Sequence, residues 1–215
     1  MIDNNFLEEF SNNILPIYEK HEKIFDDYGI HGRLHISRSI IFSEVMSNFY
    51  KKLGKNVDSF AVKYAVSFHD AGRQGNGIDF WENDSSKMCF SYLSKKYSLD
   101  HCNYASSLIE KSKDLTDINK NIVYDSDVLE IMRPCCGHGE RDGFRQSELR
   151  FLSSKDQFVD NFEQYSEIRS NLIEDAWKFI EYTEDNRELF KGNRTLYEML
   201  NIIKKNDYGI LSTIV

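Results

Sequence analysis

Apolar residues recur every three to four positions along almost the whole chain, whereas alternation of apolar and polar residues is almost absent. The first spacing places apolar side chains on one face of an α-helix, and alternation is the pattern of a β-strand. Only two prolines, Pro16 and Pro134, interrupt the 215 residues, which leaves room for long helices. The sequence therefore predicts an all-α fold.

A chain of this length can bury one core, or a core with a small appended lobe. We expect residues 1–152 to form the core and residues 153–215 to form a C-terminal helical extension packed on it. Asp58 is expected to cap the third helix. The C-terminal segment 208–215 is apolar, which predicts either that it is docked on the core or that it is an exposed recognition tail. The expected helices are 4–27 with a kink at Pro16, 33–53, 59–69, 86–97, 101–113, 118–133, 145–152, 156–190 with a break, and 194–206.

Charge and composition exclude several classes of function. The formal net charge is −8, which argues against binding of nucleic-acid duplexes because neutralising their phosphates needs clustered Lys and Arg. No apolar run is long enough for a membrane span, and the N-terminus lacks the core of a signal peptide. The four cysteines fit no zinc motif, and Cys135 and Cys136 are adjacent, which is poor geometry for a disulfide. We therefore expect a cytoplasmic protein, or one secreted into a host cell without a cleaved signal peptide.

The strongest candidate site combines His35, the adjacent pair His69 and Asp70, and Asp127. Each lies on the predicted inward side or end of a helix, and no Lys or Arg at i±4 is placed to pair with the two carboxylates. Buried carboxylates are costly unless something neutralises them, and a divalent cation such as Mn²⁺, Mg²⁺ or Fe²⁺ would do so. Such an ion turns water into a nucleophile near neutral pH. The alternative is that these residues are helix caps and core hydrogen-bonding groups.

Glycines gather near the same candidates. Six of the eleven lie in two segments, 72–77 and 137–143, and each segment adjoins a residue that could carry chemistry. Glycine lets the backbone approach a ligand closely. Trp81 and Glu82 follow the first segment, and His138 lies between two glycines of the second.

The order His35, His69-Asp70, Asp127 resembles the ligand order of the HD phosphohydrolase superfamily, over residues 28–152. This resemblance implies an HD-domain-like helical bundle in which the four residues bind one divalent metal ion. A narrower resemblance is carried by HGRLHISR (31–38), FHDAGR (68–73), DFWENDS (79–85) and DSDVLEIMR (125–133). These segments are similar to the phosphodiesterase domain of the SidE family of bacterial effectors.

SidE phosphodiesterase domains cleave a phosphodiester in ADP-ribosylated ubiquitin and release AMP. They use two histidines and a glutamate and need no bound metal, which implies catalytic roles here for His31, His138 and Glu82. One imidazole can attack phosphorus while the other protonates the leaving oxygen, and Glu82 would orient or deprotonate a ring. Arg38 and Arg73 are expected to bind the phosphate oxygens, because a guanidinium meets them in a fork.

Each of these residues also has a structural interpretation. His31 could be a neighbour of a helix cap, Glu82 a solvent-facing acid in a loop, and Trp81 a hydrophobic plug instead of a platform for a nucleobase. The chain lacks the ADP-ribosyltransferase elements of SidE proteins, and its C-terminal helices are smaller than the SidE substrate-binding cap. The expected substrate is therefore a protein already ADP-ribosylated, ubiquitin being one candidate, or a free nucleotide.

Three functions remain open from the sequence. The leading hypothesis is a phosphodiesterase acting through the histidine pair and Glu82. The second is a divalent-metal-dependent nucleotide phosphohydrolase of the HD superfamily. The third is a non-catalytic effector module that binds a protein partner through its C-terminal helices.

Overall fold

The computed structural model describes residues 2–24, 30–75, 81–110, 116–131 and 146–215. All regular structure in these ranges is helical and none of it is strand, which confirms the all-α prediction. No helix in the same ranges is both long and apolar enough to cross a membrane.

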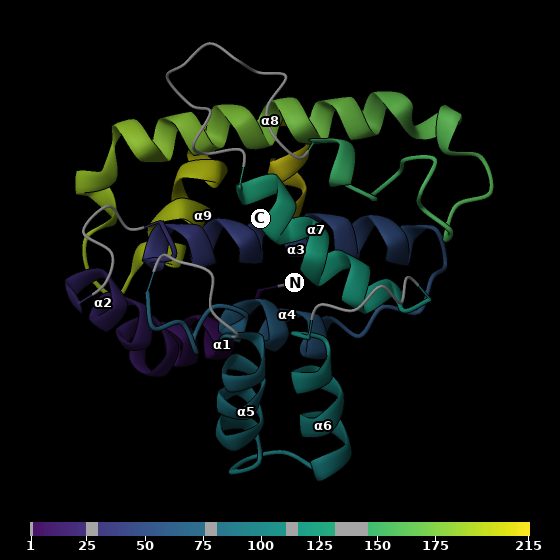
Figure 1. Cartoon of the computed structure of the whole chain (residues 1–215). Helices are drawn as coiled ribbons and strands as arrows, with labels where there is room; N and C mark the ends of the chain where they lie inside the picture. Colours follow the sequence, from purple (N-terminus) through teal and green to yellow (C-terminus); the bar gives the residue numbers. More distant parts are fainter. Residues whose placement is uncertain (1, 25–29, 76–80, 111–115, 132–145) are drawn as a thin grey trace.

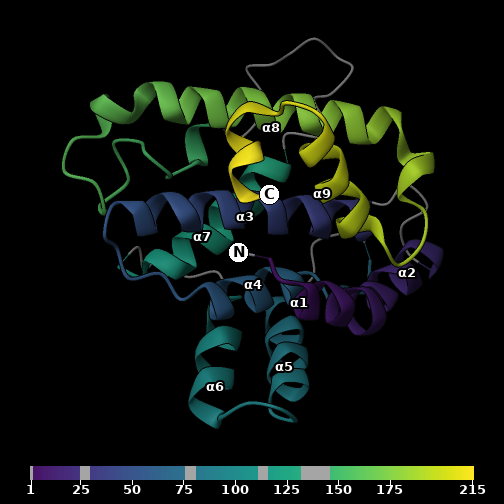
Figure 2. The same cartoon turned by 180° about the vertical axis from the view of Figure 1, so that it is seen from behind.

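Helix α3 (Arg33–Lys52) lies at the centre of the fold (Figure 1). Every residue from His35 to Ser47 is buried, so this helix is covered on all sides and not along a single apolar stripe. Helices α4 and α7 pack against it, and α8, α9 and the C-terminal turn η6 contact it as well (Figure 2). Their bounds are Ser59–Phe68 for α4, Ile118–Glu130 for α7, Ser166–Asp185 for α8, Thr195–Lys205 for α9 and Gly209–Ile214 for η6.

The N-terminal helix is irregular just before Pro16, close to the predicted kink. Helix α1 (Asn4–Glu9) runs into a π-helical turn (Phe10–Ile14), and α2 (Leu15–Ile24) follows. Proline cannot donate a backbone hydrogen bond to the preceding turn, and a local change of helix type accommodates that loss.

Helices α5 (Trp81–Leu93) and α6 (Leu99–Ser107) form a pair that projects from the rest of the fold (Figure 1). The predicted start of α5 at residue 86 was wrong by five residues. Two acids, Glu82 and Asp84, lie in its first turn, where negative charge is favourable near the positive end of the helix dipole. Trp81 and Glu82 are therefore helical residues and not part of a loop.

Two buried carboxylates explain why the chain between α7 and α8 departs from the predicted helices 145–152 and 156–190. Asp125 accepts hydrogen bonds from the backbone N–H groups of Arg150 and Phe151. Asp156 accepts from the N–H groups of Leu152 and Phe158 and from the Tyr50 hydroxyl. These bonds compete with helical hydrogen bonds. From residue 146, where the described chain resumes, only short 3₁₀ turns form, at Gln146–Glu148 and Phe162–Tyr165, before α8 begins.

The apolar C-terminus is docked on the core, which decides between the two predicted alternatives. Leu211 and Ile214 of η6 are buried against α3 and α8. They belong to one continuous apolar cluster that also includes Phe42 of α3, Phe179 of α8 and Met199 of α9. The helices after residue 152 therefore share their buried surface with those before it.

Candidate functional site

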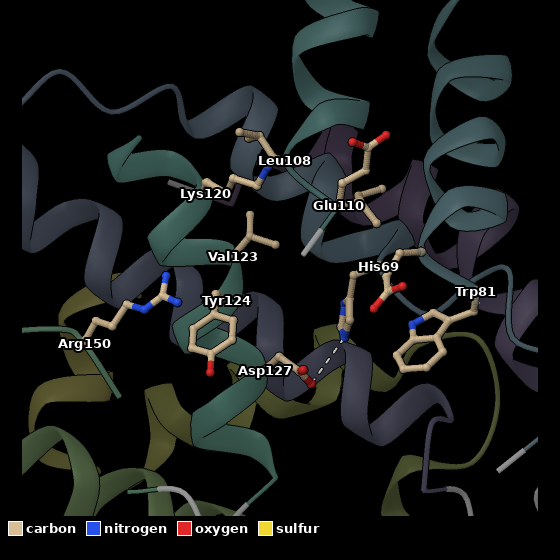
Figure 3. A pocket seen from close by; sticks show the side chains of 11 residues that line it. His69, Trp81, Leu108, Glu110, Lys120, Val123, Tyr124, Asp127 and Arg150 are labelled. Carbon is tan, nitrogen blue, oxygen red and sulfur yellow. Dashed lines mark ion pairs between the residues drawn. The ribbon is translucent and has the colours of Figure 1, made fainter. Parts of the chain in front are cut away.

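Three helices bring the four predicted metal ligands together. His35 lies in the first turn of α3, His69 and Asp70 directly follow α4, and Asp127 lies in the last turn of α7. His35 Nε2 is 3.1 Å from His69 Nε2, 3.2 Å from Asp70 Oδ2 and 3.7 Å from Asp127 Oδ1. His69 Nε2 is 3.5 Å from Asp127 Oδ1, a contact drawn in Figure 3. We call these four residues the His–Asp centre.

The Nδ1 atoms of His35 and His69 each have a fixed hydrogen-bond partner. His69 Nδ1 is 2.8 Å from the carbonyl oxygen of Val66, which can only accept, so this nitrogen carries a proton. His35 Nδ1 is 2.5 Å from Glu130 Oε2, and that carboxylate is also bound by Arg38. When the rings are neutral, both Nε2 atoms are therefore lone-pair acceptors that face one another.

Two acceptors at 3.1 Å repel each other unless a positive species lies between or beside them. A proton on His35 is one such species. Burial alone would lower the pKa of His35, but the charges of Glu130 and Asp70 outweigh it and raise this pKa to about 9. A divalent cation is the other. Two donor sets, His31/His35/Asp70 and His35/His69/Asp127, each have their ligand atoms within 4.8 Å of one another, and this mixture of nitrogen and oxygen donors suits such an ion.

Asp70 contacts several polar groups in and around the centre. Its Oδ2 atom is 2.8 Å from His31 Nδ1, and its Oδ1 atom accepts from Arg73 Nε at 2.8 Å. Burial opposes ionisation, but the charge of His69 and hydrogen bonds from His31 and His35 hold the pKa of Asp70 well below its usual range. As predicted, no Lys or Arg stands at i±4 of Asp70, but a turn after α4 brings Arg73, at i+3, onto its carboxylate.

His31 precedes α3 and is oriented from two sides. Its ring bonds to Asp70, and the chain next to it is fixed by Glu22, which accepts from both the backbone N–H and the Nε of Arg33. Gly32 is the N-cap of α3. The side chain of His31 therefore belongs to the His–Asp centre.

An open pocket adjoins the centre, and His69 and Asp127 are among the residues that line it (Figure 3). One face of α7 lines it, because Lys120, Val123, Tyr124 and Asp127 follow the helical spacing i, i+3, i+4, i+7. Further wall residues are Trp81 and Glu82 of α5, and Arg150. The pocket thus combines aromatic and basic side chains with His69 and Asp127 of the centre.

The other predicted site residues have varied environments. Glu82 lines the pocket, and the Arg73 guanidinium lies 3.5 Å from the centre of the Trp81 ring. Arg38 is fully buried and is bound by Glu130, Thr183 and Glu184, so its guanidinium serves the interior and not the predicted phosphate. His138 and the second glycine segment lie outside the described residues.

Sequence reasoning missed Glu130, Thr183 and Glu184. Glu130 lies three residues after Asp127, on the same side of α7, so helical spacing could have indicated it. Thr183 and Glu184 lie on α8 and carry no local sign of their contact with Arg38, which is 145 residues away from Thr183.

Close packing leaves no room for a side chain at Gly72, two residues after Asp70. A Cβ atom there would lie 2.5 Å from the backbone nitrogen of Ser85, and backbone cannot move aside as a side-chain end can. We expect Gly72→Ala to destabilise the fold by about 1–3 kcal/mol, measured by urea unfolding. Gly75→Ala is the control, because nothing lies within 4 Å of its added Cβ. Equal stability of the two variants would contradict this packing.

No family model matches the chain, and no curated protein and no solved structure is significantly similar to it. Function is therefore argued from the geometry and chemistry of the His–Asp centre.

Proposed function

We propose that the chain hydrolyses a phosphodiester of a nucleotide or ADP-ribosyl substrate at the His–Asp centre. The observation that carries the proposal is the convergence of His35, His69, Asp70 and Asp127 from three helices, with His31 bonded to Asp70. The order of these residues along an all-α chain agrees with an HD-like bundle, and the presence of His31 agrees with the SidE-like resemblance.

His31 is the nucleophile or base in the proposed reaction. The Asp70 carboxylate accepts the proton on His31 Nδ1, which leaves the lone pair on Nε2. Attack of Nε2 on phosphorus would break the bond to the leaving oxygen, to which His138 would give a proton, and water would then cleave the phosphohistidine. Glu82 lines the pocket that includes His69 and Asp127, and it would deprotonate that water or orient a ring.

A second candidate is a divalent-metal-dependent hydrolase of the same bonds, and the facing Nε2 atoms of His35 and His69 favour it. Together with Asp70 and Asp127 they would hold Mn²⁺, Mg²⁺ or Fe²⁺, which supplies an activated water when bound. Glu130 and the Val66 carbonyl fix the two ring orientations that such binding requires.

The pocket supports a nucleotide as the substrate class. Trp81 and Tyr124 offer aromatic surface for a base, and Lys120 and Arg150 offer positive charge for phosphate oxygens. A nucleotide bound along α7 would place one phosphate near His69 and Asp127. ADP-ribosylated ubiquitin contains such a group and is the proposed protein substrate.

AMP release from ADP-ribosylated ubiquitin by the full chain tests the proposal. We expect His31→Ala to lower the rate by at least about 100-fold, since acid–base catalysis contributes about 10²–10⁴-fold. His101→Ala is the control, because His101 is exposed, lies outside the pocket lining and has a hydrogen bond with nearby Ser98. Activity that survives EDTA favours the histidine mechanism, and activity lost to EDTA and restored by Mn²⁺ favours the metal mechanism. No release from this substrate or from bis(4-nitrophenyl) phosphate would leave the non-catalytic binding module.

A further inference from the structure

A chain of alternating charges connects α8 to the His–Asp centre. Glu130 binds His35 with Oε2 and accepts from Arg38 Nε with Oε1 at 3.0 Å. The same guanidinium also reaches α8, where Nη1 donates to Thr183 Oγ1 at 2.9 Å. Its Nη2 atom, which donates to Glu130 Oε1 at 2.5 Å, lies 2.8 Å from Glu184 Oε1 as well. Glu184 in turn binds Arg187 near the surface. None of the residues in these contacts lines the pocket.

Burial makes the connection strong. The side chains of Arg38 and Glu130 are completely buried, and that of Glu184 is 16% exposed. Charges in such an environment interact more strongly than they do in water, and a missing partner is correspondingly costly. Glu130 is shared by Arg38 and His35, so its position depends on how firmly the guanidinium is held.

The geometry of the guanidinium transmits orientation from α8. The group is planar and rigid, so fixing Nη1 and Nη2 fixes the direction of Nε. The Thr183 hydroxyl lies within hydrogen-bond distance of the carbonyls of Phe179 and Ile180, which accept its proton and leave its lone pair for Arg38. The α8 contacts thus orient the edge of Arg38 that faces Glu130.

We propose that Thr183 and Glu184 are positioning residues of the His–Asp centre, which hold the ring of His35 through Arg38 and Glu130. The inference concerns the centre of the proposed function but not the reaction that occurs there. Helix α8 would then help to orient a residue of the His–Asp centre, in addition to packing in the apolar core.

The Nδ1 proton of His35 reports on this arrangement directly. In its short bond to Glu130 we expect a low-field ¹H NMR signal that exchanges slowly with water in the full chain and is lost in His35→Gln. Glu184→Gln and Thr183→Val should each shift or broaden this signal. Thr183→Ser keeps the hydroxyl, and Asp185→Asn removes an exposed acid from the same helical turn, so both should leave it unchanged.

Two outcomes would overturn the proposal: no such signal in the unmodified chain, or an unchanged signal in both Glu184→Gln and Thr183→Val. If Thr183→Val does not fold, the isosteric Glu184→Gln decides alone. When hydrolysis is measurable, kcat should fall about 10-fold or more in Glu184→Gln with little change in KM. Failure of the hydrolysis assay in every form of the protein contradicts the proposed function and leaves the NMR result standing.

Discussion

Replacement of Asp70 by asparagine is expected to lower phosphodiester hydrolysis by about 10³–10⁴-fold, the loss typical when an amide replaces the carboxylate that orients a catalytic histidine. Asp70 contacts His31, His35 and Arg73, all of which can donate to it. Asparagine offers one acceptor oxygen and two N–H groups, so it cannot satisfy the same three donors. His31 would then lose the partner that keeps its proton on Nδ1.

AMP release under steady-state conditions measures this loss, with circular dichroism as the check on folding. Asp84→Asn is the matched control, because Asp84 is a half-exposed aspartate in the first turn of α5 that forms an ion pair with Lys87. A rate for Asp70→Asn within about tenfold of the unmodified chain would exclude Asp70 from the catalytic arrangement.

Helical periodicity was sufficient to predict which way His35 faces. His35 was placed on the inner side of a helix over 33–53, and the structure has α3 at Arg33–Lys52 with His35 buried. The Asp58 cap was predicted from residue type alone, and its side chain accepts from the N–H of Ala61. These features depend on residues a few positions apart, which is the range over which a sequence pattern carries information.

The partners of those ligands depend on tertiary contacts and could not be predicted in the same way. Arg38 was assigned to phosphate because its residue type suits that task, but Glu130 lies 92 residues away and occupies its guanidinium. Arg73 was missed as a partner of Asp70 because the search for basic partners used the spacing i±4 of a continuous helix. Asp70 lies in a turn after α4, and this turn brings Arg73, at i+3, to its carboxylate. Glu82 was placed in a loop because glycines precede it, whereas α5 already begins at Trp81.

Glu130→Ala is expected to destabilise the protein by about 3–5 kcal/mol, the range found when one partner of a buried ion pair is removed. Among the described residues, Glu184 alone would then form an ion pair with Arg38 in the core, and His35 would lose the acceptor at Nδ1. Urea unfolding followed by circular dichroism measures the change. Glu198→Ala removes an exposed carboxylate from α9 and should change stability by no more than about 0.5 kcal/mol.

The double variant Arg38→Met/Glu130→Leu separates stability from function. Apolar side chains of similar volume can replace a buried ion pair without loss, so this variant should be more stable than Glu130→Ala, and the two changes should not be additive. His35 would still lack an acceptor for its Nδ1 proton, because only Glu130 provides one among the described contacts of that nitrogen. Hydrolysis should therefore stay low in a well-folded protein. Recovery of activity together with stability would mean that Glu130 serves the fold alone, and that the orientation of His35 is set by Asp70 and His69.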